Sequence, residues 1–313
     1  MRWNTAALPD LSGRTVVVTG GNSGIGFHTA DGLAAHGAKV ILACRDLIRA
    51  ERAVARIARR RRGEVSATEL DLSSMSSVQD FAHSWTGPLD LLVNNAGVMA
   101  PPDPARTADG FELQFGTNHL GHFVLTGLLL PTLLSSDAPR VVTVASIAHQ
   151  AGTEDVLDGN AGAYEPRQAY ANSKLANLLF AVELDRQARA RALPISSVAA
   201  HPGVAATGLF TDAEGMGANR VVRLVAPAVL RTFTQSARGG ARAVLYAATE
   251  ARPGSYVGPQ RFGETRGRLG PARRSSFAND EKLAVRLWHV SEELTGFHYP
   301  WPAALPESGS GVK

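Results

Sequence analysis

Tyr170 and Lys174 lie four residues apart at the start of a segment, 170–191, whose residue pattern predicts a helix. This spacing places the phenol and the ammonium on one helix face, about one turn apart. A free tyrosine has a pKa of about 10, so a proton donor and acceptor near pH 7 needs that pKa lowered by about three units, or about 4 kcal/mol. An ammonium about 4 Å away supplies roughly 4 kcal/mol at an effective dielectric of about 20. The pair therefore predicts proton transfer by Tyr170, assisted by the charge of Lys174.

Two polar residues elsewhere in the chain are of types suited to the same chemistry. Ser146 follows a predicted strand, 140–145, and its hydroxyl can donate a hydrogen bond to a substrate oxygen as charge builds on that oxygen. It can equally cap the strand end. Asn118 lies inside a predicted helix, 110–134, where asparagine is an indifferent helix former. Either it is merely exposed, or it bends the helix and holds a water that links Lys174 to solvent.

A glycine-rich turn connects the first predicted strand to the first predicted helix. Residues 19–26 read Thr-Gly-Gly-Asn-Ser-Gly-Ile-Gly, between a strand at 16–19 and a helix at 25–36. Glycines here let the backbone turn tightly and approach a pyrophosphate, whose charge the helix N-terminus then meets. The turn predicts a dinucleotide site formed by Gly20, Asn22, Ser23, Gly24, Ile25 and Gly26.

The end of the second predicted strand, 39–43, indicates which dinucleotide binds. Arg45 follows it, and a planar guanidinium can hold the 2'-phosphate of NADP(H) in a bidentate manner. Asp46 favours NAD(H) if it contacts the ribose hydroxyls, but it is equally suited to cap the next helix. We therefore predict that NADP(H) is the cofactor.

Two further strand ends supply candidate cofactor contacts. Asp71 and Leu72 follow a predicted strand at 66–70 and can contact an adenine through a carboxylate and a backbone group, although Asp71 can equally be a helix cap. After the strand at 89–93, Asn-Asn-Ala-Gly can satisfy the backbone as the chain turns past the cofactor, and an ordinary polar turn explains it as well. The contacts expected in that turn are Asn95, Ala96 and Gly97.

Short apolar runs alternate with longer segments of helical periodicity along the chain, which is the pattern of βαβ units. We predict an α/β fold: a Rossmann-type, doubly wound parallel sheet of about seven strands, with helices on both faces, formed by residues 1–313 as a single domain. Residues 1–11 and 302–313 are expected to be loosely held termini. The remaining predicted strands span 195–200 and 255–257, and the remaining helices span 47–60, 76–85 and 237–250.

Two irregular segments, 153–168 and 203–235, follow the fifth and sixth predicted strands, where ligands of open parallel sheets bind. The second segment contains an apolar stretch, 221–230, that can be a mobile lid over a lipophilic substrate, a part of the core, or a contact to a membrane surface. We favour a substrate lid formed by residues 203–235, because Pro227 interrupts any long amphipathic helix.

In their order and spacing, these motifs resemble the short-chain dehydrogenase/reductase family: the turn at 19–26, Asn-Asn-Ala-Gly at 94–97, Asn118, Ser146, and Tyr-Ala-Asn-Ser-Lys at 170–174. The resemblance covers nearly the whole chain. It implies a catalytic tetrad in which Tyr170 is the acid and base, Lys174 also binds the nicotinamide ribose, and Asn118 and Ser146 complete the set. It further implies nicotinamide contacts from Pro202, Gly203, Val204 and Thr207.

Within that family, three short segments are similar to the retinol dehydrogenase-like branch, which also includes protochlorophyllide reductase-like enzymes. These segments are residues 43–46, 118–123 and 201–203. The branch prefers NADP(H), in agreement with the cofactor that Arg45 indicates.

The composition argues against several other classes of protein. A hydrophobic content of 44% excludes general disorder, and the arginines at 59–62 alternate with no aromatic residues, which disfavours nucleic acid as a partner. The single cysteine, Cys44, cannot form an internal disulfide and fits a reducing compartment. The histidines lack metal-ligand spacing, so no metal is expected. The chain shows neither a signal sequence nor an apolar run of about 18 residues, so we expect a cytoplasmic protein without a membrane span.

These observations predict an NADP(H)-dependent oxidoreductase that moves a hydride between a nicotinamide and a small hydrophobic aldehyde, ketone or alcohol. Two alternatives remain: reduction of a carbon–carbon double bond on the same scaffold, and NADP sensing without catalysis. The complete set of four catalytic residue types disfavours the sensor. The helix face from Tyr170 to Glu183 offers a surface for a homodimer.

Overall fold

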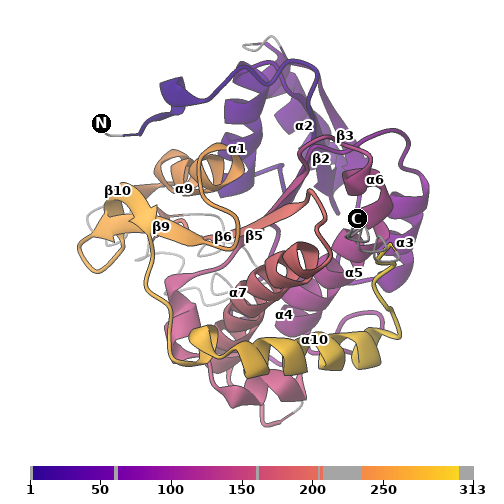
Figure 1. Cartoon of the computed structure of the whole chain (residues 1–313), viewed down its shortest axis with the longest axis vertical. Helices are drawn as coiled ribbons and strands as arrows, with labels where there is room; N and C mark the ends of the chain where they lie inside the picture. The colour runs from indigo at the N-terminus through magenta and orange to yellow at the C-terminus, as the bar shows by residue number, and fades with distance from the viewer. Residues whose placement is uncertain (1–2, 60–62, 160–161, 204, 207–234, 303–313) are drawn as a thin grey trace, which may run out of the picture.

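A central sheet of eight strands has helices on both faces (Figure 1). The structure, a computed structural model, describes residues 3–59, 63–159, 162–203, 205–206 and 235–302. The strand order is β10-β9-β6-β5-β4-β1-β2-β3, and every neighbouring pair is parallel except β9 and β10. The strands of this sheet are β1 (Thr15–Thr19), β2 (Lys39–Cys44), β3 (Val65–Glu69), β4 (Leu91–Asn94), β5 (Arg140–Val144), β6 (Ser196–Ala200), β9 (Tyr256–Arg261) and β10 (Arg266–Pro271).

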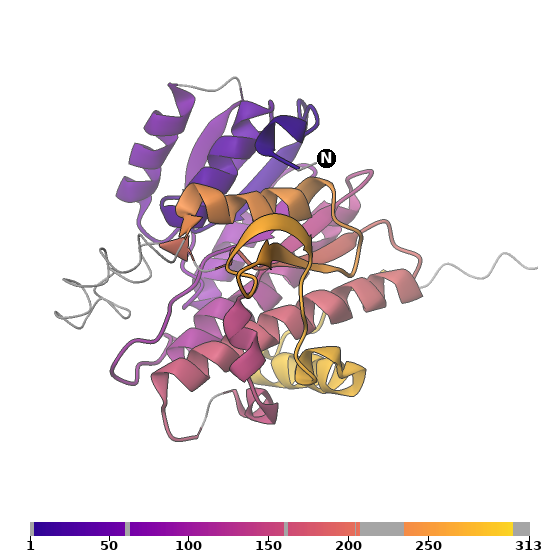
Figure 2. The ribbon, with the colours of Figure 1, turned by 90° about the vertical axis from the view of Figure 1, so that its left-hand side faces the viewer.

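The helices form two layers (Figures 1 and 2). α1, α2 and α9 cover one face of the sheet; α3, α5, α6 and α7 cover the other, and α10 packs against α7. Their bounds are α1 (Gly24–Ala35), α2 (Leu47–Ala58), α3 (Met75–His83), α4 (Leu113–Phe115), α5 (Gly121–Leu128), α6 (Leu130–Leu134), α7 (Pro166–Ala190), α9 (Ala237–Thr249) and α10 (Glu281–Thr295). Two short strands, β7 (Ala205–Ala206) and β8 (Gln235–Ser236), pair separately.

Strand β1 shows why these apolar runs form buried parallel strands. Val16 and Val18 pack in the layer of α1, whereas Val17 packs in the layer of α5. None of the three is more than 1% exposed, so the strand is apolar on both faces, as a central parallel strand must be. Because the strands run parallel, β1, β4, β5 and β6 deliver the residues that follow them to one edge of the sheet.

The predicted fold class is confirmed, and each of the seven predicted strands is present. The sheet has one strand more than predicted. That strand, β10, reads Arg-Gly-Arg-Leu-Gly-Pro and lies at the exposed sheet edge, where charged residues are common and an apolar run is not required.

The predicted helices differ from the structure in three places. The segment 110–134 is not one helix: a π-helical turn, Gly116–Leu120, separates α4 from α5, and α6 begins afresh beside Pro131. α7 begins four residues before Tyr170, because Glu165 caps it and Pro166 suits a first helical position. α10 was not predicted, although Asp280 caps its start and Gly296, with φ of +63°, ends it.

Two expectations about surfaces also need correction. The α7 face from Tyr170 to Glu183 is covered by the chain's own elements, since residues 171–181 are all buried and α10 packs on this helix (Figure 1). That face is therefore not free for a homodimer. Residues 3–11 are not loose: the Trp3 ring packs edge-on against Tyr246, and Leu8 is 6% exposed in the core.

Candidate active site

The glycine-rich turn follows β1 directly and opens α1. Gly20 and Gly24 have φ angles of +64° and +55°, a left-handed backbone that favours glycine. The Gly20 N–H donates to the Ala43 carbonyl of β2 at 2.8 Å. The Asn95 side chain, after β4, donates to the Thr19 carbonyl, also at 2.8 Å. The ends of three strands therefore meet at this turn.

The N-terminus of α1 lacks a side-chain cap. Ser23 holds the N-cap position but its side chain makes no capping hydrogen bond, whereas the N-cap side chains of α2, α3, α7, α9 and α10 each accept one. The first-turn N–H groups of α1 are therefore left without a capping side chain, at the positive end of the helix dipole. This arrangement suits an anion such as a pyrophosphate.

Arg45 and Asp46, directly after β2, have different surroundings. Arg45 is exposed beside the strand end. The Asp46 carboxylate accepts from the Arg49 N–H at 2.9 Å and lies 3.1 Å from Arg49 Nε, so it caps α2, as one of the two interpretations of the sequence held. Asp71 instead accepts from the Ser73 N–H and hydroxyl, at 2.9 and 2.6 Å, and forms a turn ahead of α3 rather than its cap.

The structure brings Ser146, Tyr170 and Lys174 together. The Tyr170 hydroxyl lies near enough to the Ser146 side chain for Ser146 to favour the charged form of the phenol. Ser146 Oγ accepts from the Ala148 N–H at 3.2 Å, which leaves the serine proton available for donation. Lys174 Nζ lies 5.8 Å from the centre of the Tyr170 ring and donates to the Val144 carbonyl at 3.2 Å.

Asn118 lies in the π-helical turn, where it is fully buried, so the exposed alternative is wrong. Its Oδ1 accepts from the Val98 N–H at 2.8 Å, and its Nδ2 donates to the Val98 carbonyl and to Ser173 Oγ, each at 2.9 Å. A Cβ on Gly97 would lie 2.9 Å from Asn118 Oδ1 and 3.5 Å from Lys174 Nζ. Glycine at this position therefore allows the chain after β4 to pass between the two side chains.

Burial shifts the pKa values of both members of the proton-transfer pair towards their neutral forms. It raises the pKa of Tyr170 to about 12, against the opposing effect of the hydrogen bond from Ser146. It lowers the pKa of Lys174 to about 8. From the sequence, the charge of Lys174 was expected to bring the pKa of Tyr170 near 7. For the protein by itself that expectation is wrong, because desolvation of the buried phenolate outweighs the opposing effect of Ser146.

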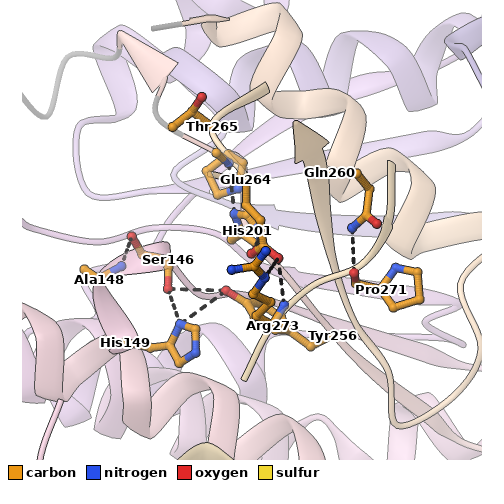
Figure 3. A network of polar contacts seen from close by, with 12 residues as sticks. Ser146, Ala148, His149, His201, Tyr256, Gln260, Glu264, Thr265, Pro271 and Arg273 are labelled. Carbon is orange, nitrogen blue, oxygen red and sulfur yellow. Dashed lines mark hydrogen bonds and ion pairs between the residues drawn. The ribbon is translucent and has the colours of Figure 1, made fainter. Parts of the chain in front are cut away.

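A polar network holds the backbone of Ser146 in place (Figure 3). Its carbonyl accepts from His149 Nδ1 at 2.7 Å and from the Tyr256 hydroxyl at 3.3 Å. His149 Nε2 in turn accepts from the Ser275 N–H at 3.3 Å. These supports were not predicted from the sequence. His149 stands three residues after Ser146, but no local pattern links Ser146 to Tyr256 on β9.

Pro202 and Gly203 follow β6 at the same edge of the sheet. Gly203 has a φ of +70°, and its N–H donates to His201 Nδ1 at 3.2 Å. His201 Nε2 lies 3.4 Å from Glu264 Oε2 in the hairpin between β9 and β10 (Figure 3). Two expected contacts and the apolar stretch lie outside the described residues, namely Val204, Thr207 and 221–230.

The histidines considered as metal ligands are buried in separate hydrogen-bond networks, and burial lowers the pKa of each: His119, His122, His149 and His201. Among the described residues, no cluster of three or more histidine, cysteine or acidic side chains could hold a metal ion. In the same part of the chain, no helix combines the length and hydropathy needed to span a membrane.

The chain is similar to known dehydrogenases over most of its length. Residues 14–216 match the family model described as short chain dehydrogenase. Retinol dehydrogenase 13 of Homo sapiens is 38% identical over 309 residues, covering 93% of this chain and 87% of the relative. Polyprenol dehydrogenase of Mus musculus is 42% identical over 306 residues, covering 92% and 86%. A crystal structure of an uncharacterized protein from Mycobacterium Paratuberculosis is 43% identical, with a TM-score of 0.79, covering 96% of this chain and all of the other.

Proposed function

Because the chain belongs to the short-chain dehydrogenase family, in its retinol dehydrogenase-like branch, we propose that it is an NADP(H)-dependent oxidoreductase. It moves a hydride between the nicotinamide and a hydrophobic aldehyde or ketone, or the matching alcohol. The observation that carries the proposal is the buried Lys174 amine 5.8 Å from the centre of the Tyr170 ring, with the Ser146 side chain beside the same phenol.

The residues at the strand edge suit a nicotinamide dinucleotide. The uncapped α1 N-terminus and the left-handed glycines suit its pyrophosphate, Arg45 its 2'-phosphate, and Lys174 the nicotinamide ribose. The bound cofactor supplies or accepts the hydride. The proposed contacts from the chain are Gly20, Asn22, Ser23, Gly24, Ile25, Gly26, Arg45, Asp71, Leu72, Asn95, Ala96, Gly97, Tyr170, Lys174, Pro202, Gly203, Val204 and Thr207.

In the proposed reaction, Tyr170 and Ser146 act on the substrate oxygen. With its pKa raised to about 12, Tyr170 keeps its proton at neutral pH and can donate it to the oxygen as negative charge develops there. The Ser146 hydroxyl turns from the phenol to the same oxygen and stabilises that charge. In the reverse direction Tyr170 must lose its proton, which the positive charges of Lys174 and of the oxidised nicotinamide favour. The protein by itself is therefore better prepared for carbonyl reduction.

The substrate class rests on the names of the relatives, since retinol and polyprenol are long apolar alcohols. The test is to follow NADPH consumption by the purified protein against a series of aldehydes and ketones of increasing apolar length, including α,β-unsaturated aldehydes. We expect the alcohol as product and a higher kcat/KM for the longer members. A saturated aldehyde as product would identify a double-bond reductase instead, and NADPH binding without any turnover would identify the sensor.

Arg45→Asp is the direct test of the cofactor proposal. The variant loses a guanidinium beside the phosphate and gains a carboxylate that repels it, so NADPH affinity should fall at least about tenfold while NADH affinity rises. Both dissociation constants are measured by nucleotide fluorescence. Arg52→Asp makes the same charge change on the exposed side of α2 and should leave both constants nearly unchanged. Equal losses in the two variants would show that only the general charge matters.

A further inference from the structure

The hydroxyl of Thr19, the last residue of β1, has four polar neighbours within 3.3 Å. It accepts from the Asn95 N–H at 2.8 Å and from the Ala96 N–H at 3.0 Å. His122 Nε2 lies 2.9 Å from the same oxygen, and the Val93 carbonyl lies 3.3 Å from it. Thr19 is fully buried, so water does not replace any of these partners.

The hydrogen-bond partners of Thr19 determine which nitrogen of the His122 ring carries the proton. A hydroxyl oxygen has two acceptor positions, and the two N–H groups after β4 use both of those on Thr19. The Thr19 proton must then be donated, and His122 Nε2 is nearer than the Val93 carbonyl. His122 Nε2 is therefore the unprotonated nitrogen, which accepts.

The other ring nitrogen leads to the same tautomer independently. His122 Nδ1 lies 2.9 Å from the Asn118 carbonyl, which can only accept, so Nδ1 carries the ring proton. His122 is 1% exposed, and burial together with the charge of Lys174 lowers its pKa to about 4. The ring is thus neutral at physiological pH, with one fixed donor and one fixed acceptor.

The contacts join two halves of the site that no other single side chain described above connects. His122 Nε2 accepts from Thr19, the residue that opens the glycine-rich turn. His122 Nδ1 donates to the Asn118 carbonyl in the π-helical turn. We propose that His122 is a positioning residue, which fixes the glycine-rich turn that binds the dinucleotide relative to the Asn118 turn of the catalytic set. This inference rests on the proposed function, and it can be tested by NADPH binding as well as by turnover.

Three substitutions of His122 separate the two ends of the bridge. Phenylalanine fills a similar volume and makes neither contact. Asparagine carries its amide at the depth of Nδ1, so it can donate to Asn118 but does not reach Thr19. Glutamine carries its amide oxygen near the position of Nε2, so it can accept from Thr19 but loses Asn118. The matched control is His119→Phe, because His119 is also a neutral histidine, 1% exposed, and within the described ranges its side chain hydrogen-bonds Ser291 on α10 alone.

The expected kinetics differ between the variants. Removing one hydrogen bond, with the displacement that follows, should change an affinity or a rate about tenfold. His122→Phe should bind NADPH about tenfold more weakly and turn over about tenfold more slowly. Glutamine should restore the affinity and asparagine the turnover. His119→Phe should lower the melting temperature comparably and leave both kinetic quantities near wild type.

The tautomer provides a readout that stability alone does not move. In ¹⁵N spectra of wild type, His122 Nδ1 should resonate as the protonated nitrogen and Nε2 as the unprotonated one. The inference is overturned if the spectra show the opposite tautomer, or if the His122 variants and His119→Phe lose stability alone. If wild type reduces no carbonyl, the proposed function fails, while NADPH titration and the spectra still decide the role of His122.

Discussion

Tyr170→Phe is expected to lower turnover with NADPH at least about a hundredfold while leaving the NADPH dissociation constant almost unchanged. The substitution removes one oxygen, that of the phenol proposed to donate the proton. Without it, the developing alkoxide keeps the Ser146 hydroxyl as a hydrogen-bond donor but loses the acid that protonates it, and water must take that role. The ring itself stays, so the packing of α7 is preserved. Single-turnover measurements at saturating NADPH check the expected loss.

A matched variant separates this effect from the loss of any tyrosine hydroxyl. Tyr246→Phe removes the same atom from α9, where the ring packs against Trp3 at the other face of the sheet. It should leave turnover near wild type. Near-normal turnover in Tyr170→Phe would mean that another group supplies the proton, and the acid and base assignment would then be abandoned.

Lys174→Met should also abolish most activity, by at least about a hundredfold, and yet stabilise the folded protein at pH 7. The amine is 4% exposed, and burial lowers its pKa from 10.5 to about 8. Holding it protonated at pH 7 costs the folded state about 3 kcal/mol on this basis. The loss of its hydrogen bond is tolerable, because the Val144 carbonyl keeps the Asn177 side-chain donor at 3.1 Å.

The sign of the pH dependence follows from linkage. Between about pH 8 and 10.5 the folded protein has lost the Lys174 proton while the unfolded chain retains it, so the contribution of Lys174 to stability rises with pH across this window. Below pH 8 both states are protonated and the cost of burial is constant. Denaturant unfolding of wild type and Lys174→Met, without cofactor, should therefore converge between pH 8 and 10.5. Lys39→Met removes a half-exposed amine and should show no such convergence. A wild type more stable than Lys174→Met at pH 7 would contradict the argument.

The candidate site residues could be picked out from the sequence because their signals are local. The four-residue spacing of Tyr170 and Lys174, the glycines after β1 and the apolar strands each lie within one short stretch of sequence. The fold class followed from the alternation of these stretches. Likewise, Asp46 was recognised as a candidate cap from its place before a helical pattern, and its carboxylate does accept from the first turn of α2.

The features that could not be predicted depend on contacts between residues that are far apart in the sequence. Residues 110–134 have the periodicity of one helix, but Asn118 bonds to Val98 and Ser173, and the backbone adopts a π-turn that carries it to both. Tyr256 supports Ser146 from 110 residues away. The expected lowering of the Tyr170 pKa is wrong for a similar reason: the nearby cation can be read from the sequence, whereas the desolvation that raises this pKa depends on the folded structure.

The position of α10 matters for anyone who alters this chain. It packs over the helix that carries Tyr170 and Lys174, and the rings of Tyr299 and Trp301, which follow on from that of Trp288, extend this cover past its end. Everything proposed to touch cofactor or substrate is encoded before this stretch, so a shortened gene ending near residue 275 would still specify every reacting group. The truncated protein would nonetheless expose the apolar face of α7 to water. We therefore expect it to aggregate rather than to fold into a smaller active enzyme.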